Sequence, residues 1–185
     1  MNSDLSKALN FFQRGRLVEA KNLVEKIVKN EKKNPQALNL YAFIFYYQNN
    51  FNAALEQWQK AIKINPNYIE AYNGCGNAYK NLKKFEEAVE SFKKAIQIEP
   101  RYFEAQINLG SVLIKLERFE DAIKNFDKVI DVDNMAAQAF QGKAYSLMKL
   151  KKYEEAIYNF NKSIKINSND ANVFYNLGAT YETVS

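Results

Sequence analysis

The chain has 185 residues, of which 47% are hydrophobic and 25% charged, with only 3 prolines and 6 glycines. Such a composition describes a soluble chain that buries a core and favours helix over strand or loop. The apolar runs are too short to span a bilayer, the start of the chain lacks the features of a secretion signal, and the single cysteine, Cys75, fits a reducing compartment. We therefore expect a cytoplasmic protein that does not insert into membranes.

The net charge of +5 does not indicate nucleic-acid binding. Acidic pairs such as Glu86–Glu87 open the predicted second helices of the third, fourth and fifth copies, and lysines such as Lys93 and Lys94 crowd the later turns. This arrangement complements the helix dipole at both ends and interleaves the two signs of charge. We therefore expect no nucleic-acid partner.

Five segments of 34 residues follow one another without insertion or deletion, and each contains two predicted helices. They cover residues 1–34, 35–68, 69–102, 103–136 and 137–170, and a partial sixth copy covers residues 171–185. The first copy matches the others least well, because Asp4 and Lys7 stand where later copies have larger apolar residues. A terminal repeat has no neighbour on one side, so we interpret this copy as an end cap. The spacing predicts a single repeat domain over residues 1–185.

The third copy carries a recognisable pattern at Tyr72, Gly76, Tyr79, Ala88, Phe92, Ala95 and Pro100. This pattern resembles the tetratricopeptide repeat family, and the resemblance covers the whole chain. It implies an all-α fold, a right-handed α-solenoid built from antiparallel helix pairs.

Two rows of residues recur in every full copy and predict the core. One row is alanine throughout, which suits the closest crossing of two helices: Ala20, Ala54, Ala88, Ala122 and Ala156. The other row is mostly aromatic: Val24, Trp58, Phe92, Phe126 and Phe160, with Leu17, Phe51, Phe85, Phe119 and Tyr153 beside it. Because these rings recur identically along the chain, we interpret them as core and not as a ligand site.

The last segment, Ala171 to Ser185, supplies a first helix only. Leu177 and Tyr181 then lack the second helix that would cover them. Either the sequence is a fragment of a longer protein or another chain covers this end. We predict a concentration-dependent homodimer through residues 171–184.

Catalytic and metal chemistry find little support in the sequence. The chain has no histidine and one cysteine, which excludes Ser-His-Asp and Cys-His arrangements, histidine metal sites and thiolate zinc clusters. The glycines at Gly74 and Gly76 lie in a predicted helix and are not followed by a phosphate-binding motif. We therefore predict no enzymatic activity, no catalytic residue, no metal site and no cofactor.

The resemblance implies a binding groove lined by the first helix of each copy. At the corresponding positions we predict the site residues Asn39, Phe43, Tyr46, Tyr47, Asn73, Asn77, Lys80, Asn108, Lys115, Tyr145 and Lys149. The same positions also include Phe12, Glu70, Asn81, Glu104, Ile107, Ser111, Gln138, Gln141, Tyr175 and Asn176.

These residue types suit an extended peptide of a partner protein. An asparagine side chain donates and accepts hydrogen bonds, so a ladder of asparagines pairs with a peptide backbone of any sequence. The aromatic residues would hold an apolar side chain, and Lys80, Lys115 and Lys149 an acidic one. The plain alternative is a structural surface, because asparagine and lysine are abundant throughout the chain.

Tetratricopeptide domains that bind chaperone C-termini use two asparagines and flanking basic residues to hold a carboxylate. Asn77 and Asn108 match these asparagines, but Asn73, Gln138 and Gly142 occupy the basic places. A terminal carboxylate would therefore lack its charged partners, and we expect an internal or otherwise neutral segment.

Two functions follow from the resemblance. The first is a non-catalytic interaction module that binds an extended peptide segment in its groove. The alternative is the N-terminal substrate-recognition arm of a larger enzyme, because similar arrays precede glycosyltransferase and sulfotransferase domains in some bacterial proteins.

Overall fold

A computed structural model describes residues 3–184, which form eleven α-helices and no strand. The helices are α1 (Ser3–Gln13), α2 (Leu17–Asn30), α3 (Pro35–Tyr47), α4 (Phe51–Ile64), α5 (Ile69–Asn81), α6 (Phe85–Ile98), α7 (Phe103–Lys115), α8 (Phe119–Ile130), α9 (Ala137–Lys149), α10 (Tyr153–Ile166) and α11 (Ala171–Val184). The helices α3, α5, α7, α9 and α11 begin 34 residues apart, as predicted from the repeat. The all-α solenoid class is confirmed.

The turn inside each helix pair has the same backbone conformation in every repeat. Its central residue has a positive φ, which is 72° at Gly15 and between 57° and 60° at Asn49, Lys83, Glu117 and Lys151. The amide of the next residue then donates to the last turn of the first helix, as from Lys84 N to the Tyr79 carbonyl at 2.9 Å. This Schellman arrangement reverses the chain and makes each pair antiparallel.

The predicted core rows are buried. All five alanines of the first row are fully buried, and Val24, Trp58, Phe92, Phe126 and Phe160 are at most 2% exposed. The flanking row from Leu17 to Tyr153 is half-buried. The interpretation of the main aromatic row as core is therefore confirmed.

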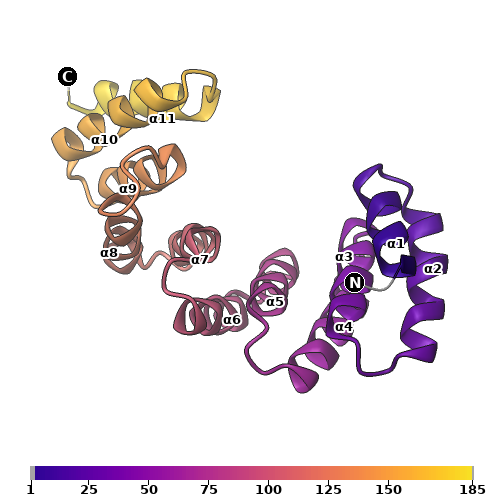
Figure 1. Ribbon diagram of the computed structural model, residues 1–185. Helices are drawn as coiled ribbons and strands as arrows, with labels where there is room; N and C mark the ends of the chain where they lie inside the picture. The colour runs from indigo at the N-terminus through magenta and orange to yellow at the C-terminus, as the bar shows by residue number, and fades with distance from the viewer. Residues whose placement is uncertain (1–2, 185) are drawn as a thin grey trace. The chain divides into compact units, whose positions relative to one another are not determined.

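The helices form two compact units, the first ending at Pro100 and the second beginning at Arg101. In each unit every helix packs on the next, and the first helices of successive repeats also touch one another: α1 with α3 and α3 with α5 in the first unit, and α7 with α9 and α9 with α11 in the second. Figure 1 shows these stacked pairs. One face of each unit is therefore made of first helices.

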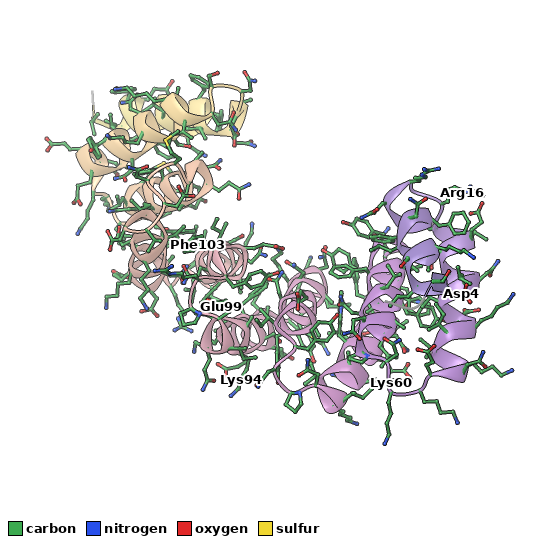
Figure 2. The ribbon with its side chains drawn as sticks, in the orientation of Figure 1. Asp4, Arg16, Lys60, Lys94, Glu99 and Phe103 are labelled. Carbon is green, nitrogen blue, oxygen red and sulfur yellow. The ribbon has the colours of Figure 1, made fainter. Side chains whose placement is uncertain are left out.

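The charged residues lie mostly on the outer turns and on the second helices. Lys60 on α4 and Lys94 on α6 extend away from the ribbon (Figure 2). At the start of α2, the guanidinium of Arg16 contacts the carboxylate of Glu19 at 2.7 Å, with both side chains exposed. Such local pairs need no ligand to explain them.

Between residues 3 and 184, no helix is both long and apolar enough to cross a membrane.

Candidate functional site

Four aromatic side chains, which we call the aromatic surface, lie together on the first helices of the first unit. They are Phe12 of α1 and Phe43, Tyr46 and Tyr47 of α3. The Phe12 ring centroid lies 6.4 Å from that of Phe43 and 5.5 Å from that of Tyr47, and the Tyr46 and Tyr47 centroids are 5.8 Å apart. Tyr47 is 61% exposed. The structure thus brings the three predicted aromatic residues of α3 together with Phe12.

Trp58 of α4 is fully buried beneath the aromatic surface. Its ring meets Phe43 edge-on at 5.3 Å, and its indole Nε1 donates to Oδ1 of Asn39 at 2.8 Å. A Cβ on Gly74 would lie 2.3 Å from the indole, so only glycine lets α5 approach it this closely. Asn39 therefore serves the core of this unit.

Tyr68, just before α5, also hydrogen-bonds to Asn39. Burial raises the pKa of Tyr68 to about 12, the charge of Glu70 adds to the rise, and the Asn39 contact opposes it. The amide of Asn39 is thus engaged on two sides within the protein, which leaves it little capacity to pair with a peptide backbone.

The remaining predicted residues of the first unit lie on α5. Asn73 is only 5% exposed, while Asn77 and Lys80 are half-buried. Asn81 donates from Nδ2 to the Tyr46 hydroxyl at 2.9 Å and to the Asn77 carbonyl at 2.8 Å, which joins α5 to the aromatic surface. The side chain of Asn73 offers a ligand almost no surface.

The second unit has a pocket of about 670 Å³, which we call the amide pocket. It is lined by Ile107, Asn108, Ser111, Ile114, Lys115, Phe126, Gln138, Gln141, Gly142, Tyr145, Asn172 and Asn176. Three of the predicted site residues, Asn108, Lys115 and Tyr145, therefore meet at one pocket, together with five of the further groove positions: Ile107, Ser111, Gln138, Gln141 and Asn176. Lys149 does not line it, but its ammonium lies 5.4 Å from the centre of the Tyr145 ring.

Changes of side-chain size at equivalent repeat positions relate the amide pocket to the aromatic surface, and the largest is from Phe43 to Ser111. Phe126 is the residue two repeats after Trp58, and it lies under Gly142 as Trp58 lies under Gly74, with an added Cβ 2.3 Å away in both places. The residue two repeats after Phe43 is Ser111. Because a hydroxymethyl group replaces a ring that fills the space in the first unit, we attribute the hollow above Phe126 to Ser111.

The amide pocket is rich in hydrogen-bonding groups and nearly free of charge. Five of its side chains are primary amides, each with a donor and an acceptor: Asn108, Gln138, Gln141, Asn172 and Asn176. Lys115 is the single charged residue among the lining residues, and none of them is acidic. Phe126, Ile107 and Ile114 supply apolar contact area.

Sequence reasoning missed three lining residues, Ile114, Phe126 and Asn172, and gave Gly142 only as a groove place that lacks a basic residue. Phe126 belongs to the core row and is 2% exposed, so its position predicted burial and nothing more. Gly142 carried a usable signal, because a glycine inside a helix indicates close approach by another group.

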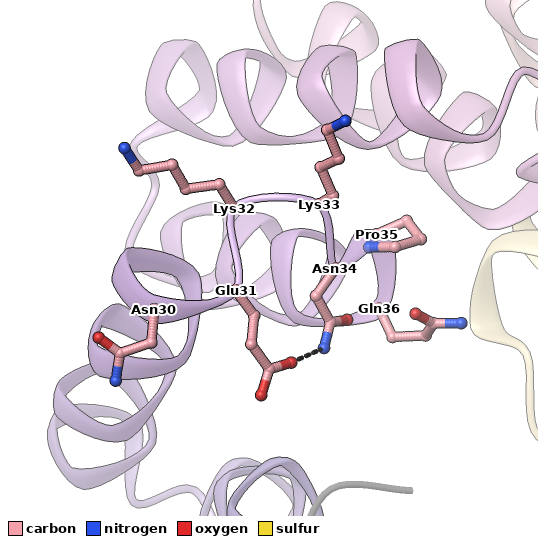
Figure 3. A pocket seen from close by; sticks show the side chains of 7 residues that line it. All are labelled: Asn30, Glu31, Lys32, Lys33, Asn34, Pro35 and Gln36. Atoms are coloured by element: carbon pink, nitrogen blue, oxygen red, sulfur yellow. Dashed lines mark hydrogen bonds between the residues drawn. The ribbon is translucent and has the colours of Figure 1, made fainter.

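A second concavity lies at the turn between α2 and α3, over residues 30–36. There Asn34 caps α3 by accepting from the Ala37 amide at 3.0 Å, and its Nδ2 donates to Glu31 at 2.8 Å. Figure 3 shows Lys32 and Lys33 pointing away from these groups. The polar groups of this turn thus serve helix capping.

The described residues offer no evident catalytic group. Between residues 3 and 184, no three histidine, cysteine, aspartate or glutamate side chains gather closely enough to hold a metal ion. Burial raises the pKa of Cys75 to about 12, which keeps its thiol neutral and unreactive at ordinary pH.

Solved structures share this fold at low sequence identity. The chain is similar to MamA (20% identical, TM-score 0.81, covering 87% of this chain and 94% of that one). It also matches YrrB, described as a TPR protein with an unusual peptide-binding site (24% identical, TM-score 0.74, covering 86% and 82%). A tetratricopeptide repeat protein from Parabacteroides merdae gives 22% identity and a TM-score of 0.85, covering 98% and 72%.

One curated relative matches a short stretch. A DnaJ homolog subfamily C member 7 homolog from Dictyostelium discoideum is 34% identical over 53 residues, which are 29% of this chain and 10% of that protein. The chain thus matches about a tenth of that relative's length.

Family models match most of the chain. A TPR repeat model matches residues 43–83 and 144–184, and two tetratricopeptide repeat models match residues 69–102 and 103–134. The fold indicates a role in protein–protein interaction. The chain belongs to the tetratricopeptide repeat family.

Proposed function

We propose that residues 1–185 act as one non-catalytic interaction domain in the cytoplasm, which binds an extended peptide segment of a partner protein. The observation that carries this proposal is the amide pocket, an open site of about 670 Å³ lined by five side-chain amides. Its volume lies in the range of ordinary ligand sites, about 300–1,000 Å³. The aromatic surface of the first unit is the second proposed contact.

The amide pocket suits an extended chain because such a chain presents unpaired backbone N–H and C=O groups. Amides on both sides of the pocket, such as Asn108 on α7 and Gln141 on α9, pair with these groups whatever the peptide sequence. An apolar side chain of the peptide packs on Phe126 and Ile114. The ammonium of Lys115 then favours an acidic residue next to it.

The aromatic surface offers a different contact. The ring of Tyr47 is exposed and the rings of Phe43 and Tyr46 are half-buried, so together they present an apolar surface made of uncharged side chains. Aromatic side chains of this kind give large contact area at a low cost in conformational entropy. We assign to it an apolar or aromatic side chain of the partner.

The similarity to YrrB supports this proposal at the level of the fold. That protein is described as having a peptide-binding site, and it shares the helix arrangement over 86% of this chain. The choice of peptide rests on the residues of the amide pocket and of the aromatic surface, and not on that similarity.

A Ser111→Phe variant tests the proposal. The new ring should fill the amide pocket as Phe43 fills the corresponding space in the first unit, so the fold persists and binding is lost. Fluorescence polarisation with a labelled library of extended peptides, each with an apolar residue beside an acidic one, should show at least a tenfold loss of affinity. The control is Ser168→Phe, which places the same ring on an exposed turn.

A second pair of variants tests the charge preference. Lys115→Glu should reverse the preference for acidic peptides, while Lys128→Glu, an equal charge change on the exposed side of α8, should leave it unchanged. Unaltered binding by both Ser111→Phe and Lys115→Glu would move the ligand site away from the amide pocket.

The alternative proposal is a substrate-recognition arm of a larger enzyme of the glycosyltransferase or sulfotransferase type. It uses the same surfaces, and the peptide then belongs to the substrate. The reading frame that encodes this chain distinguishes the two, because a catalytic domain following residue 185 in the same frame is required by the arm and by nothing else.

We also propose that two copies associate through residues 171–184. In α11 the large apolar residues Phe174, Tyr181 and Val184 are about half exposed. Leu177 packs on the core of its own unit. Light scattering over a concentration series tests the association, with Tyr181→Glu as the dissociated control. A monomer signal from both proteins at every concentration would contradict it.

A further inference from the structure

Lys115 and Lys149 are the last residues of two first helices, α7 and α9, which contact one another in the second unit. They are 34 residues apart and therefore hold the same place in successive repeats. A lysine at this place complements the helix dipole. The first helices of the first unit nevertheless end in Gln13, Tyr47 and Asn81, so the repeat itself does not require a lysine there.

Both ammonium groups lie beside the amide pocket. Lys115 is one of its lining residues. The ammonium of Lys149 lies 5.4 Å from the centre of the Tyr145 ring, and Tyr145 also lines the pocket. Because a cation at this distance is attracted to the face of an aromatic ring, the Lys149 side chain is held toward the pocket. Two positive charges therefore border the pocket at the C-terminal turns of α7 and α9.

These two charges are available to a ligand. In the same unit, the ammonium of Lys143 is taken up by the carboxylate of Asp127 at 2.5 Å. Within residues 3–184, neither Lys115 nor Lys149 forms an ion pair with a carboxylate. Both side chains are exposed, so pairing with an anion of the ligand requires little loss of hydration.

We propose that Lys115 and Lys149 together select a peptide segment in which two acidic residues flank one apolar residue. The apolar side chain enters the amide pocket and packs on Phe126, and the two carboxylates pair with the two ammonium groups at the rim. This inference rests on the proposed function and names the class of peptide that the pocket takes.

The spacing of the two acidic residues follows from the geometry of helices and strands. Axes of packed helices lie about 8–10 Å apart, which sets the separation of the two lysine backbones. In an extended peptide, alternate residues lie on the same side and are about 7 Å apart, while adjacent residues point to opposite sides. The flexible stem of lysine accommodates the remaining difference. One residue between the two acids is therefore the matching spacing, and it points into the pocket.

The composition of the pocket leaves this selection to the two lysines. Its five primary amides pair with a peptide backbone whatever the sequence. None of its lining residues is acidic, so none repels the carboxylates of the peptide. The sign and the spacing of the charges on the peptide are thus recognised by Lys115 and Lys149.

Fluorescence polarisation with labelled synthetic peptides tests this selection. Four peptides have a central leucine and differ only in its two neighbours, which are both glutamate, glutamate on one side or on the other, or both glutamine. Each glutamate should tighten binding about two- to fivefold, the range for exposed ion pairs. A fifth peptide, with both glutamates after the leucine, should gain from one glutamate only, because the second points away from the lysines.

Variants assign the gain to the lysines. Lys149→Gln removes one charge from an exposed side chain, so it should weaken the peptide with two glutamates to the affinity of a peptide with one. It should leave the glutamine peptide unchanged, and Lys149→Arg should keep the wild-type preference. The matched control is Lys165→Gln, which removes an exposed lysine of α10 and should alter none of these affinities. Circular dichroism should show equal helicity for all variants.

The outcomes separate this selection from peptide binding itself. If the wild type binds the peptides with one and two glutamates equally, and Ser111→Phe abolishes that binding, the selection by two lysines is overturned and the proposed function stands. If Lys165→Gln weakens the peptide with two glutamates as much as Lys149→Gln does, the effect belongs to overall charge and the selection is again overturned. Failure of all five peptides to bind would overturn both proposals.

Discussion

The aromatic surface of the first unit and the amide pocket of the second occupy equivalent positions of the same repeat, yet one is filled and the other is hollow. Phe43 packs edge-on against Trp58 in the first unit, while Ser111 leaves Phe126 at the floor of a pocket in the second. A glycine meets the buried ring at equivalent places in both sites, Gly74 and Gly142, but Gly110 also meets Phe126 where the first unit has Ala42. The comparison teaches that side-chain size at equivalent positions decides between a packed surface and a binding site, with Phe43 against Ser111 as the largest difference.

Removing the buried ring beneath each site is expected to lower the free energy of unfolding most. The loss should be larger beneath the aromatic surface than beneath the amide pocket. Trp58→Ala should lower the free energy of unfolding by about 3–5 kcal/mol, because the indole is fully buried and hydrogen-bonded to Asn39. Phe126→Ala should cost less, about 3 kcal/mol, since part of that ring faces the pocket. Urea denaturation followed by circular dichroism measures both. Equal losses would remove the distinction between filled and open sites.

Converting the filled site into an open one is expected to cost less. Phe43→Ser should lower the free energy of unfolding by about 2 kcal/mol, because the half-buried ring loses its contacts with Trp58 and Phe12. The same urea titration measures the loss. Ser111→Phe is the reverse change and should alter stability by less than about 1 kcal/mol, because it enters existing space. A large loss for Ser111→Phe would show that the pocket is not the equivalent of the Phe43 site.

One substitution at equivalent glycines should have opposite effects in the two units. Gly76→Ala should destabilise by about 1–3 kcal/mol, since the methyl group meets the Phe92 ring. Gly178→Ala should stabilise by up to about 1 kcal/mol, because alanine is the better helix former and its methyl group meets open space. Thermal melts of dilute protein report both signs. Destabilisation by both variants would show that the face of α11 is covered in the monomer.

Alkaline pH should lower the stability of the first unit, because the Cys75 thiol and the Tyr68 hydroxyl are held neutral by burial. Burial raises the pKa of Cys75 from its ordinary value of 9.0 to about 12, and that of Tyr68 from 10.0 to about 12. The folded state therefore holds these protons more tightly, and the stability this gives is complete below pH 9 and lost as the pH rises toward 12. Cys75→Ala should lose less thermal stability than the wild type over this range. Superimposable pH profiles would contradict this assignment.

The sequence by itself determined the repeat and the core. The 34-residue spacing set where α3, α5, α7, α9 and α11 begin, and the alanine and aromatic rows gave the buried residues, because helical periodicity fixes which side chains face the neighbouring helix. The same periodicity brought the expected groove residues onto the first helices.

Only the tertiary structure decided which of those residues a ligand can reach. Asn39 accepts a hydrogen bond from Trp58 and Asn73 is buried, whereas Asn108 and Tyr145 line a pocket. The position of a residue on its helix gives the direction of its side chain. It does not give how much of the surrounding space is filled by side chains of the adjacent repeats. Whether a ligand can reach a side chain depends on the ring packed against the nearby glycine and on the size of the residue beside that ring. These residues come from different helices and meet only when the helices pack.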